Sequence, residues 1–147
     1  MANFNQILCA VDFSPTSEKA LEYAVDLAGR LGSELYVMHV YQLPAYAMPD
    51  GGAFEIPVDI QTGLTNQLQT HLDTFVKPRM STGVKITTGL HEGIPYVEIV
   101  RSAKERHADL VIIGTHGRTG LPHLLMGSIA ERVVRTSEVP VLSVRAP

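Results

Sequence analysis

A polar, glycine-rich segment near the C-terminal end has the residue types and the spacing of an anion site. An apolar run over residues 111–113 ends at Gly114, a glycine-rich stretch continues to residue 120, and Gly127-Ser128 then opens a helical pattern. Glycine lets the backbone approach a ligand closely. The first amides of a helix have no intrahelical partner and point at whatever lies there. A strand, a glycine-rich loop and a helix start in this order predict a site for phosphate.

The spacing of these glycines excludes two common kinds of nucleotide-binding loop. A Walker-type loop needs a glycine, four residues and then Gly-Lys-Ser or Gly-Lys-Thr, and the chain contains no Gly-Lys pair. Gly114, Gly117 and Gly120 are spaced G-x-x-G-x-x-G, which differs from the dinucleotide fingerprint G-x-G-x-x-G. The glycine spacing therefore argues against nucleotide binding of the kinase type or the dehydrogenase type.

The remaining chemistry-bearing residues give no catalytic pattern. The six histidines lack metal-ligand spacing, the carboxylates do not pair as an acid and a base, and no G-x-S-x-G elbow occurs. The lone Cys9 lies in an apolar run and is expected in the core. Asp12 directly follows that run, and because Ser14-Pro15 already provides a helix cap and first turn, ligand contact is favoured for Asp12 over capping. We expect a protein that is not an enzyme.

Strand-like and helix-like patterns alternate along the chain. Apolar or alternating runs predict strands over 7–11, 35–40, 84–90, 110–113 and 139–144. Helical spacing predicts helices from Ser14-Pro15 to Gly32, through Leu64 to Lys77-Pro78, over 94–107, and from Gly127-Ser128 to 134. Pro140 favours an edge or a strand start for the last strand.

Five strands separated by helices predict a doubly wound parallel sheet. In such sheets ligands bind beyond the carboxyl ends of the strands, where the strand order reverses. Asp12, Val40 and Gly114 each stand at the end of a predicted strand. We therefore expect these three residues to converge on one site although they are far apart in the sequence.

Composition indicates one domain over residues 1–147. The chain is 45% hydrophobic and 18% charged, which is typical of globular proteins, and its net charge of −3 argues against nucleic acid or an anionic membrane as a partner. Its N-terminal residues lack the charged and apolar regions of a signal peptide, and no apolar run approaches the roughly 20 residues of a membrane span. A cytoplasmic protein is expected.

Several segments together resemble the universal stress protein A family, in its ATP-binding branch. They are Val11-Asp12-Phe13-Ser14, His39-Val40, Ala108-Asp109-Leu110, Gly114 to Gly120, Leu125 to Ala130, and Val139 to Leu142. The likeness covers the whole chain except residues 41–58. It implies an α/β fold of three layers, flavodoxin-like or adenine nucleotide alpha-hydrolase-like, with a doubly wound five-stranded parallel sheet in the order 3-2-1-4-5.

The same resemblance implies an ATP site and its residues. Carried over position by position, the residues in contact with the nucleotide would be Ala10, Val11, Asp12, Val40, Ile113, Gly114, His116, Gly117, Arg118, Gly127, Ser128 and Ile129. Mg²⁺ or Mn²⁺ could accompany ATP, and Asp12 could help to hold that ion. The resemblance also implies a homodimer formed through the C-terminal strand, and leaves a higher oligomer open.

The expected function is that of a small nucleotide-dependent regulator of a stress response, which acts through an unidentified protein partner or through its assembly state. Three alternatives stay open. The first is a slow ATPase that uses Asp12 or His116, and the second is a scaffold of the same fold that binds no nucleotide tightly. The third is a flavin enzyme or an adenylate-transferring enzyme, although their Ser-Gly-Gly-x-Asp-Ser and His-x-Gly-His signatures are absent. The segment 41–58 could pack over the site, contact a partner or cover a sheet edge.

Overall fold

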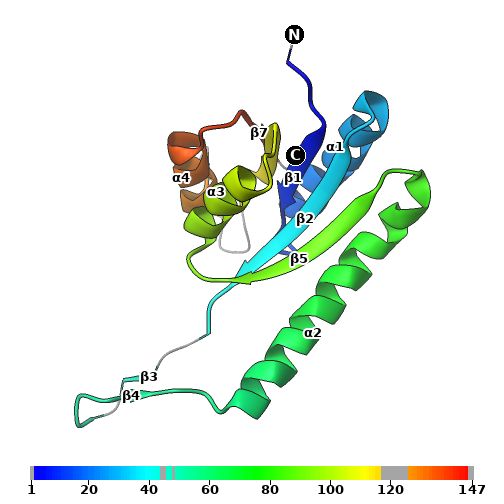
Figure 1. The fold of residues 1–147 in the computed structure, drawn as a ribbon. Helices are drawn as coiled ribbons and strands as arrows, with labels where there is room; N and C mark the ends of the chain where they lie inside the picture. Colours follow the sequence, from blue (N-terminus) through cyan, green and yellow to red (C-terminus); the bar gives the residue numbers. More distant parts are fainter. Residues whose placement is uncertain (1, 44–45, 48, 117–125, 146–147) are drawn as a thin grey trace.

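The core of the molecule is a five-stranded, wholly parallel sheet (Figure 1). The computed structural model describes residues 2–43, 46–47, 49–116 and 126–145. The sheet strands are β1 (Gln6–Ala10), β2 (Glu34–Tyr41), β5 (Ile86–Glu92), β6 (Leu110–Gly114) and β7 (Val141–Val144). Their spatial order is β5-β2-β1-β6-β7, which is 3-2-1-4-5 when the sheet strands are counted along the chain. The predicted fold class is confirmed.

Helices cover both faces of the sheet. They are α1 (Pro15–Leu31), α2 (Val58–Val76) with the short 3-10 helix η1 (Lys77–Thr82), α3 (Pro95–Glu105) and α4 (Ser128–Thr136). One buried cluster joins α1 and α2 to one face of the sheet, and a second joins α3 and α4 to the other (Figure 1). No helix in the part of the chain that the structure describes is both long and apolar enough to cross a membrane.

The sequence of α1 explains where this helix begins and ends. Ser14 is the N-cap, and its side chain accepts a hydrogen bond from the amide of Ser17, while Pro15 occupies the first turn. Gly32 ends the helix in the left-handed conformation with φ 70°, which glycine adopts without steric cost. Both predicted ends of this helix are confirmed.

Two strands are shorter at their starts than the sequence predicts. β5 begins at Ile86 rather than at residue 84, because η1 extends to Thr82 and Gly83 follows it with φ 83°. β7 begins after Pro140, which has no amide hydrogen, although the Pro140 carbonyl accepts from the amide of Val111 at 2.9 Å. The predicted position of this proline, at the start of an edge strand, is confirmed.

The segment between β2 and α2 contains two short strands that the sequence analysis did not predict. β3 (Tyr46–Ala47) and β4 (Ala53–Phe54) pair antiparallel with each other and form a separate two-stranded sheet. In Figure 1 this pair lies at the lower left, away from the five-stranded sheet, and leads into the N-terminal half of α2. We call β3, β4 and α2 up to Leu68 the arm.

Candidate functional site

The strand order reverses between β1 and β6, which are neighbours at the centre of the sheet. The chain leaves β1 toward α1 on one face, and α4, the next helix after β6, lies on the opposite face. Ligands of doubly wound sheets bind beyond the strand ends at such a point. We call the ends of β1 and β6, with the starts of α1 and α4, the switch-point site.

Apolar side chains from three strands gather on the α3 and α4 side of this site. Ala10 of β1 and Ile113 of β6 are buried there, and Val40 of β2 packs against the same cluster. The structure thus brings together three of the residues that the family resemblance places in contact with the nucleotide. Met126, which is not among the predicted site residues, also packs here. Its position next to Gly127-Ser128 was the available signal.

The side chain of Val11 does not join this group. It is buried in the other layer, in the cluster formed by α1 and α2. Its amide donates to the carbonyl of Met38 at 2.9 Å, and its carbonyl lies 2.8 Å from Nδ1 of His39. Residues alternate between the two faces of a strand, so neighbours such as Ala10 and Val11 point into opposite layers. Ala10 therefore lies on the side of the switch-point site, and Val11 lies in the core on the opposite face of the sheet.

Asp12 forms hydrogen bonds with residues at the start of α1. One of its carboxylate oxygens, Oδ1, accepts from the amide of Ser14 at 3.0 Å, and its own amide donates to Oγ of Ser17 at 3.3 Å. Ser14 Oγ in turn accepts from the amide of Ser17 at 3.2 Å. The sequence favours ligand contact over capping for Asp12. The structure shows a local bond from the amide of Ser14 to one of its carboxylate oxygens, and ligand contact stays a prediction.

Gly114 permits a close approach between β6 and the start of α1. A Cβ atom at Gly114 would lie 2.8 Å from Cγ2 of Thr16 and 3.3 Å from the amide nitrogen of Ser17. The helix start therefore packs directly on the end of the strand. Gly114 contributes to the site by holding these two elements together, and its predicted contact with a nucleotide stays a prediction.

Gly127 permits a second close approach, between the start of α4 and the residue after β6. Its amide donates to the carbonyl of Thr115, and a Cβ atom at Gly127 would lie 2.9 Å from that oxygen. Thr115 is itself fixed, because its amide donates to the carbonyl of Val144 at 2.8 Å and its side chain is buried. The start of α4 is thus tied to the end of β6.

The start of α4 presents backbone amides without a side-chain cap. Gly127 is the N-cap and has no side chain, and none of the residues described in the structure caps this helix in its place. The first intrahelical bond runs from the amide of Glu131 to the carbonyl of Gly127, so the amides of 128–130 precede it. The Ile129 side chain is 40% exposed, so its contribution to an anion site would come from its amide.

His116 lies directly after Thr115, and its Nδ1 is 3.0 Å from the Thr115 hydroxyl. It is half-buried at the edge of the site. Gly117 and Arg118, which the resemblance assigns to phosphate binding, lie outside the described residues. Among the residues that are described, no group of three or more His, Cys, Asp or Glu side chains could hold a metal ion.

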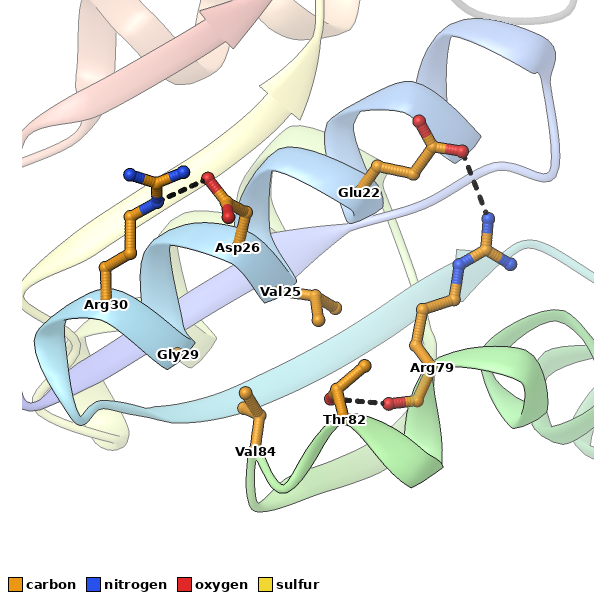
Figure 2. A pocket seen from close by; sticks show the side chains of 8 residues that line it. All are labelled: Glu22, Val25, Asp26, Gly29, Arg30, Arg79, Thr82 and Val84. Carbon is orange, nitrogen blue, oxygen red and sulfur yellow. Dashed lines mark hydrogen bonds and ion pairs between the residues drawn. The ribbon is translucent and has the colours of Figure 1, made fainter.

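A pocket of about 450 Å³ lies elsewhere, between the later turns of α1 and η1 (Figure 2). Its rim carries two ion pairs, Arg30 with Asp26 at 2.9 Å and Arg79 with Glu22 at 3.5 Å. Because Val84, which precedes β5, also lines it, the pocket lies toward the amino ends of the strands. It is separate from the switch-point site.

Comparison with known proteins agrees with this geometry. The model of the universal stress protein family matches residues 3–145, and the chain belongs to this family. It is 35% identical over 145 residues to universal stress protein MJ0531 of Methanocaldococcus jannaschii. The aligned residues cover 98% of this chain and 84% of that protein.

Solved structures share the fold over the whole chain. The structure of MJ0577, also from Methanocaldococcus jannaschii, has a TM-score of 0.81 at 26% identity and covers 99% of this chain and 98% of that one. A universal stress protein from Archaeoglobus fulgidus, solved in complex with dAMP, has a TM-score of 0.63 at 22% identity and covers 98% and 99% of the two chains.

Proposed function

We propose that this chain binds ATP at the switch-point site and uses it as a regulatory ligand. The observation that carries the proposal is the uncapped start of α4 beside the apolar group of Ala10, Val40 and Ile113. Amides of a helix start that no described side chain caps suit a phosphate, and an apolar group with a few polar neighbours suits an adenine ring. The complex of a family member with dAMP supports an adenine nucleotide as the kind of ligand.

In this proposal the nucleotide is held by residues of β1, β2 and α4 and of the segments next to these elements. Ala10 and Val40 contact the base, together with Met126, and the amides of Ser128 and Ile129 bind phosphate. Asp12 and His116 stand at the edge of the same site and would face the ribose or an accompanying Mg²⁺ or Mn²⁺ ion. Gly114 and Gly127 keep the two helix starts close to the strand ends.

Hydrolysis of ATP is proposed to be slow or absent. The chain has no Walker lysine to stabilise charge on the transferred phosphoryl group. Among the described residues of the switch-point site, Asp12 and His116 are the candidates for a general base, and Asp12 already accepts a hydrogen bond from the amide of Ser14. Single-turnover assays with Mg²⁺ or Mn²⁺ test this, and turnover above roughly 1 s⁻¹ would identify an ordinary enzyme.

The experiment for the proposed ligand begins with the purified chain. Nucleotide released by acid from the protein is identified by chromatography, and the emptied protein is titrated with ATP, AMP and NAD in a calorimeter. Preferential binding of ATP supports the proposal. Equal or tighter binding of NAD contradicts it, and so does a failure to bind any adenine nucleotide.

The proposal includes a homodimer formed through β7. This strand is an edge of the sheet, and an uncovered edge exposes unpaired backbone groups. The carbonyls of Pro140 and Val144 bond to β6, so by alternation the amide of Ser143 faces outward. Ser143→Pro removes that amide, and we expect sedimentation to show loss of the β7 contact. An unchanged mass would contradict pairing through this edge.

A further inference from the structure

Phe13, the residue after Asp12, has a backbone conformation that its side chain disfavours. Its φ is 66°, in the left-handed region, where a residue with a bulky side chain is uncommon. Among the described residues other than glycine, only Phe13 and His107 have a positive φ. Such a conformation costs free energy and persists only where the surrounding structure holds it. We therefore expect contacts of the Phe13 side chain to fix the chain between β1 and α1.

Aromatic side chains of β2 and α2 pack around the ring of Phe13. His71 of α2 stacks on it, with ring centroids 4.0 Å apart and an angle of 16° between the planes. The ring of His39, from β2, lies at 4.5 Å, and Phe75, one turn after His71, meets the Phe13 ring edge-on at 5.4 Å. Stacked and edge-to-face ring pairs at such distances attract each other. We call Phe13, His39, His71 and Phe75 the aromatic clamp.

The aromatic clamp lies on the other face of the sheet from the apolar group of the switch-point site. Phe13 and Phe75 pack against the buried cluster of α1 and α2, whereas Ala10 and Val40 belong to the cluster of α3 and α4. His71 is exposed and lies in the turn of α2 that follows the arm. An adenine ring that packs on Ala10 and Val40 would therefore not contact the ring of His71.

The aromatic clamp is nevertheless connected to Asp12 on both sides of that residue. Before it, Nδ1 of His39 donates to the carbonyl of Val11 at 2.8 Å and so fixes the peptide between Val11 and Asp12. After it, the φ angle of Phe13 sets the direction of the peptide between Asp12 and Phe13. The packed ring of Phe13 holds that angle. The clamp therefore limits the directions in which the Asp12 carboxylate can point.

The Asp12 carboxylate has a defined place in the structure, since its Oδ1 accepts from the amide of Ser14 at 3.0 Å. If the ring contacts are lost, the left-handed conformation of residue 13 keeps its cost without the contacts that offset it. The peptide before residue 13 should then rotate. The carboxylate would leave both the amide of Ser14 and the ligand that it is proposed to face.

We propose that the aromatic clamp positions the Asp12 carboxylate for the nucleotide, which makes Phe13 and His71 positioning residues of the switch-point site. This inference rests on the proposed function, because the bound nucleotide is the ligand that Asp12 would face. The position of Asp12 can also be measured without any ligand. The positioning role and the proposed function can therefore fail separately.

The test uses three single variants of the full chain. His71→Ala removes the ring that stacks on Phe13, and His71→Phe replaces it with another ring that can stack there. Thr70→Ala truncates the preceding residue of the same helix, which is also exposed, and serves as the control. Because these positions are exposed, all three variants should fold, and circular dichroism checks that they do.

Hydrogen exchange of the Ser14 amide measures the position of Asp12 without ligand, because this amide donates to Asp12 Oδ1. We expect exchange about three- to tenfold faster in His71→Ala, the range that corresponds to the loss of one aromatic pair. Exchange in His71→Phe and Thr70→Ala should match the wild type. The amide of Val111, which donates to the carbonyl of Pro140 within the sheet, monitors general stability and should not change.

Calorimetric titration with ATP and Mg²⁺ then measures the effect on the ligand. His71→Ala should lower the affinity by about three- to tenfold, and His71→Phe should restore it. The same substitution is repeated in an Asp12→Asn background, where the charge that the clamp positions is absent. There we expect His71→Ala to change the affinity by less than about twofold, because two residues that act through one contact have non-additive effects.

The outcomes separate the positioning role from the proposed function. Unchanged exchange at Ser14 in His71→Ala, or equal acceleration at Ser14 and Val111, overturns the positioning role whatever ATP does. An equal loss of ATP affinity with and without the Asp12 carboxylate also overturns it, because the clamp would then act by another route. If exchange at Ser14 responds as expected but the wild type binds no ATP, the proposed function is wrong, and the clamp holds Asp12 only for the start of α1.

Discussion

Helices α1 and α4 both begin beyond the carboxyl ends of the strands, and the backbone amides of their first turns find hydrogen-bond partners in different ways. At the start of α1, Ser14 caps the amide of Ser17 and Asp12 caps the amide of Ser14, while Pro15 contributes no amide hydrogen. At the start of α4, the N-cap is Gly127, and no side chain among the described residues takes over the capping role. Side chains next to α1 in the sequence thus cap its start, whereas the start of α4 has no side-chain cap among the described residues.

This difference explains how the carboxyl ends of the strands can hold both a tightly packed helix start and a ligand site. The start of α1 packs tightly on Gly114, so it serves the joint between β6 and the helix layer. The start of α4 keeps its amides of 128–130 outside the intrahelical pattern, where an anion can replace the missing cap. The start of α4 is therefore expected to bind phosphate, and the start of α1 to stabilise the fold.

The largest expected effect is a loss of ATP binding in Gly127→Ala. The new Cβ would lie 2.9 Å from the backbone oxygen of Thr115, which is too close, so the start of α4 has to shift. Hydrogen bonds to a charged group contribute about 1.5–3 kcal/mol each, so displacement of one or two amides should weaken ATP binding by at least about tenfold. Calorimetric titration measures the loss.

Gly63→Ala is the matched control for that substitution. Gly63 lies within α2, and a Cβ atom there would have no neighbour within 4 Å. We expect unchanged ATP affinity and a gain of roughly 0.5–1 kcal/mol in the free energy of unfolding, because alanine favours a helix over glycine. Equal ATP affinity of the two alanine variants would show that α4 does not bind the phosphate.

An intermediate effect is expected from two substitutions of Asp12. Asparagine keeps a side-chain oxygen that can accept from the amide of Ser14, whereas alanine removes it. Asp12→Asn should therefore lower the affinity for ATP with Mg²⁺ by about tenfold, one charge-assisted contact, at nearly unchanged stability. Asp12→Ala should lower both. If Asp12→Asn binds ATP like the wild type, Asp12 only caps α1.

The smallest effect on binding is expected from Ser14→Ala. This substitution removes the N-cap of α1, which costs about 1 kcal/mol of unfolding free energy in typical helices. Urea unfolding measures that loss. ATP affinity should stay within about twofold of the wild type, a difference below the 1.4 kcal/mol that corresponds to a tenfold change. A large loss of ATP affinity in Ser14→Ala would show that the start of α1 contributes to the ligand site.

The local part of the fold could be predicted because its signals lie within a few residues. Ser14-Pro15 and Gly32 define the ends of α1 through caps and a positive φ, and these depend only on neighbouring residues. The parallel sheet and its order followed from the alternation of elements and from the family resemblance. The short pair β3 and β4 was missed because two strands of two residues leave no periodic pattern.

The parts of the site that depend on tertiary geometry could not be predicted from the sequence. Helical spacing shows that Leu64 and Leu72 share one face of α2, but only the extent of the sheet decides that Leu72 is buried and Leu64 is exposed. Similarly, the order Ala10-Val11 does not tell which of the two faces α4, since that depends on which layer each face of β1 contacts.

The backbone amides of the two helix starts offer the most direct test of the central claim. In a two-dimensional ¹H–¹⁵N spectrum of the labelled chain, titration with ATP should move the amide signals of Ser128, Ile129 and Ala130 strongly, while those of Ser17 and Glu18 stay close to their original positions. Adenosine, which lacks phosphate, should leave the α4 amides nearly unchanged. Large shifts at Ser17 and Glu18 without shifts at the start of α4 would contradict the account.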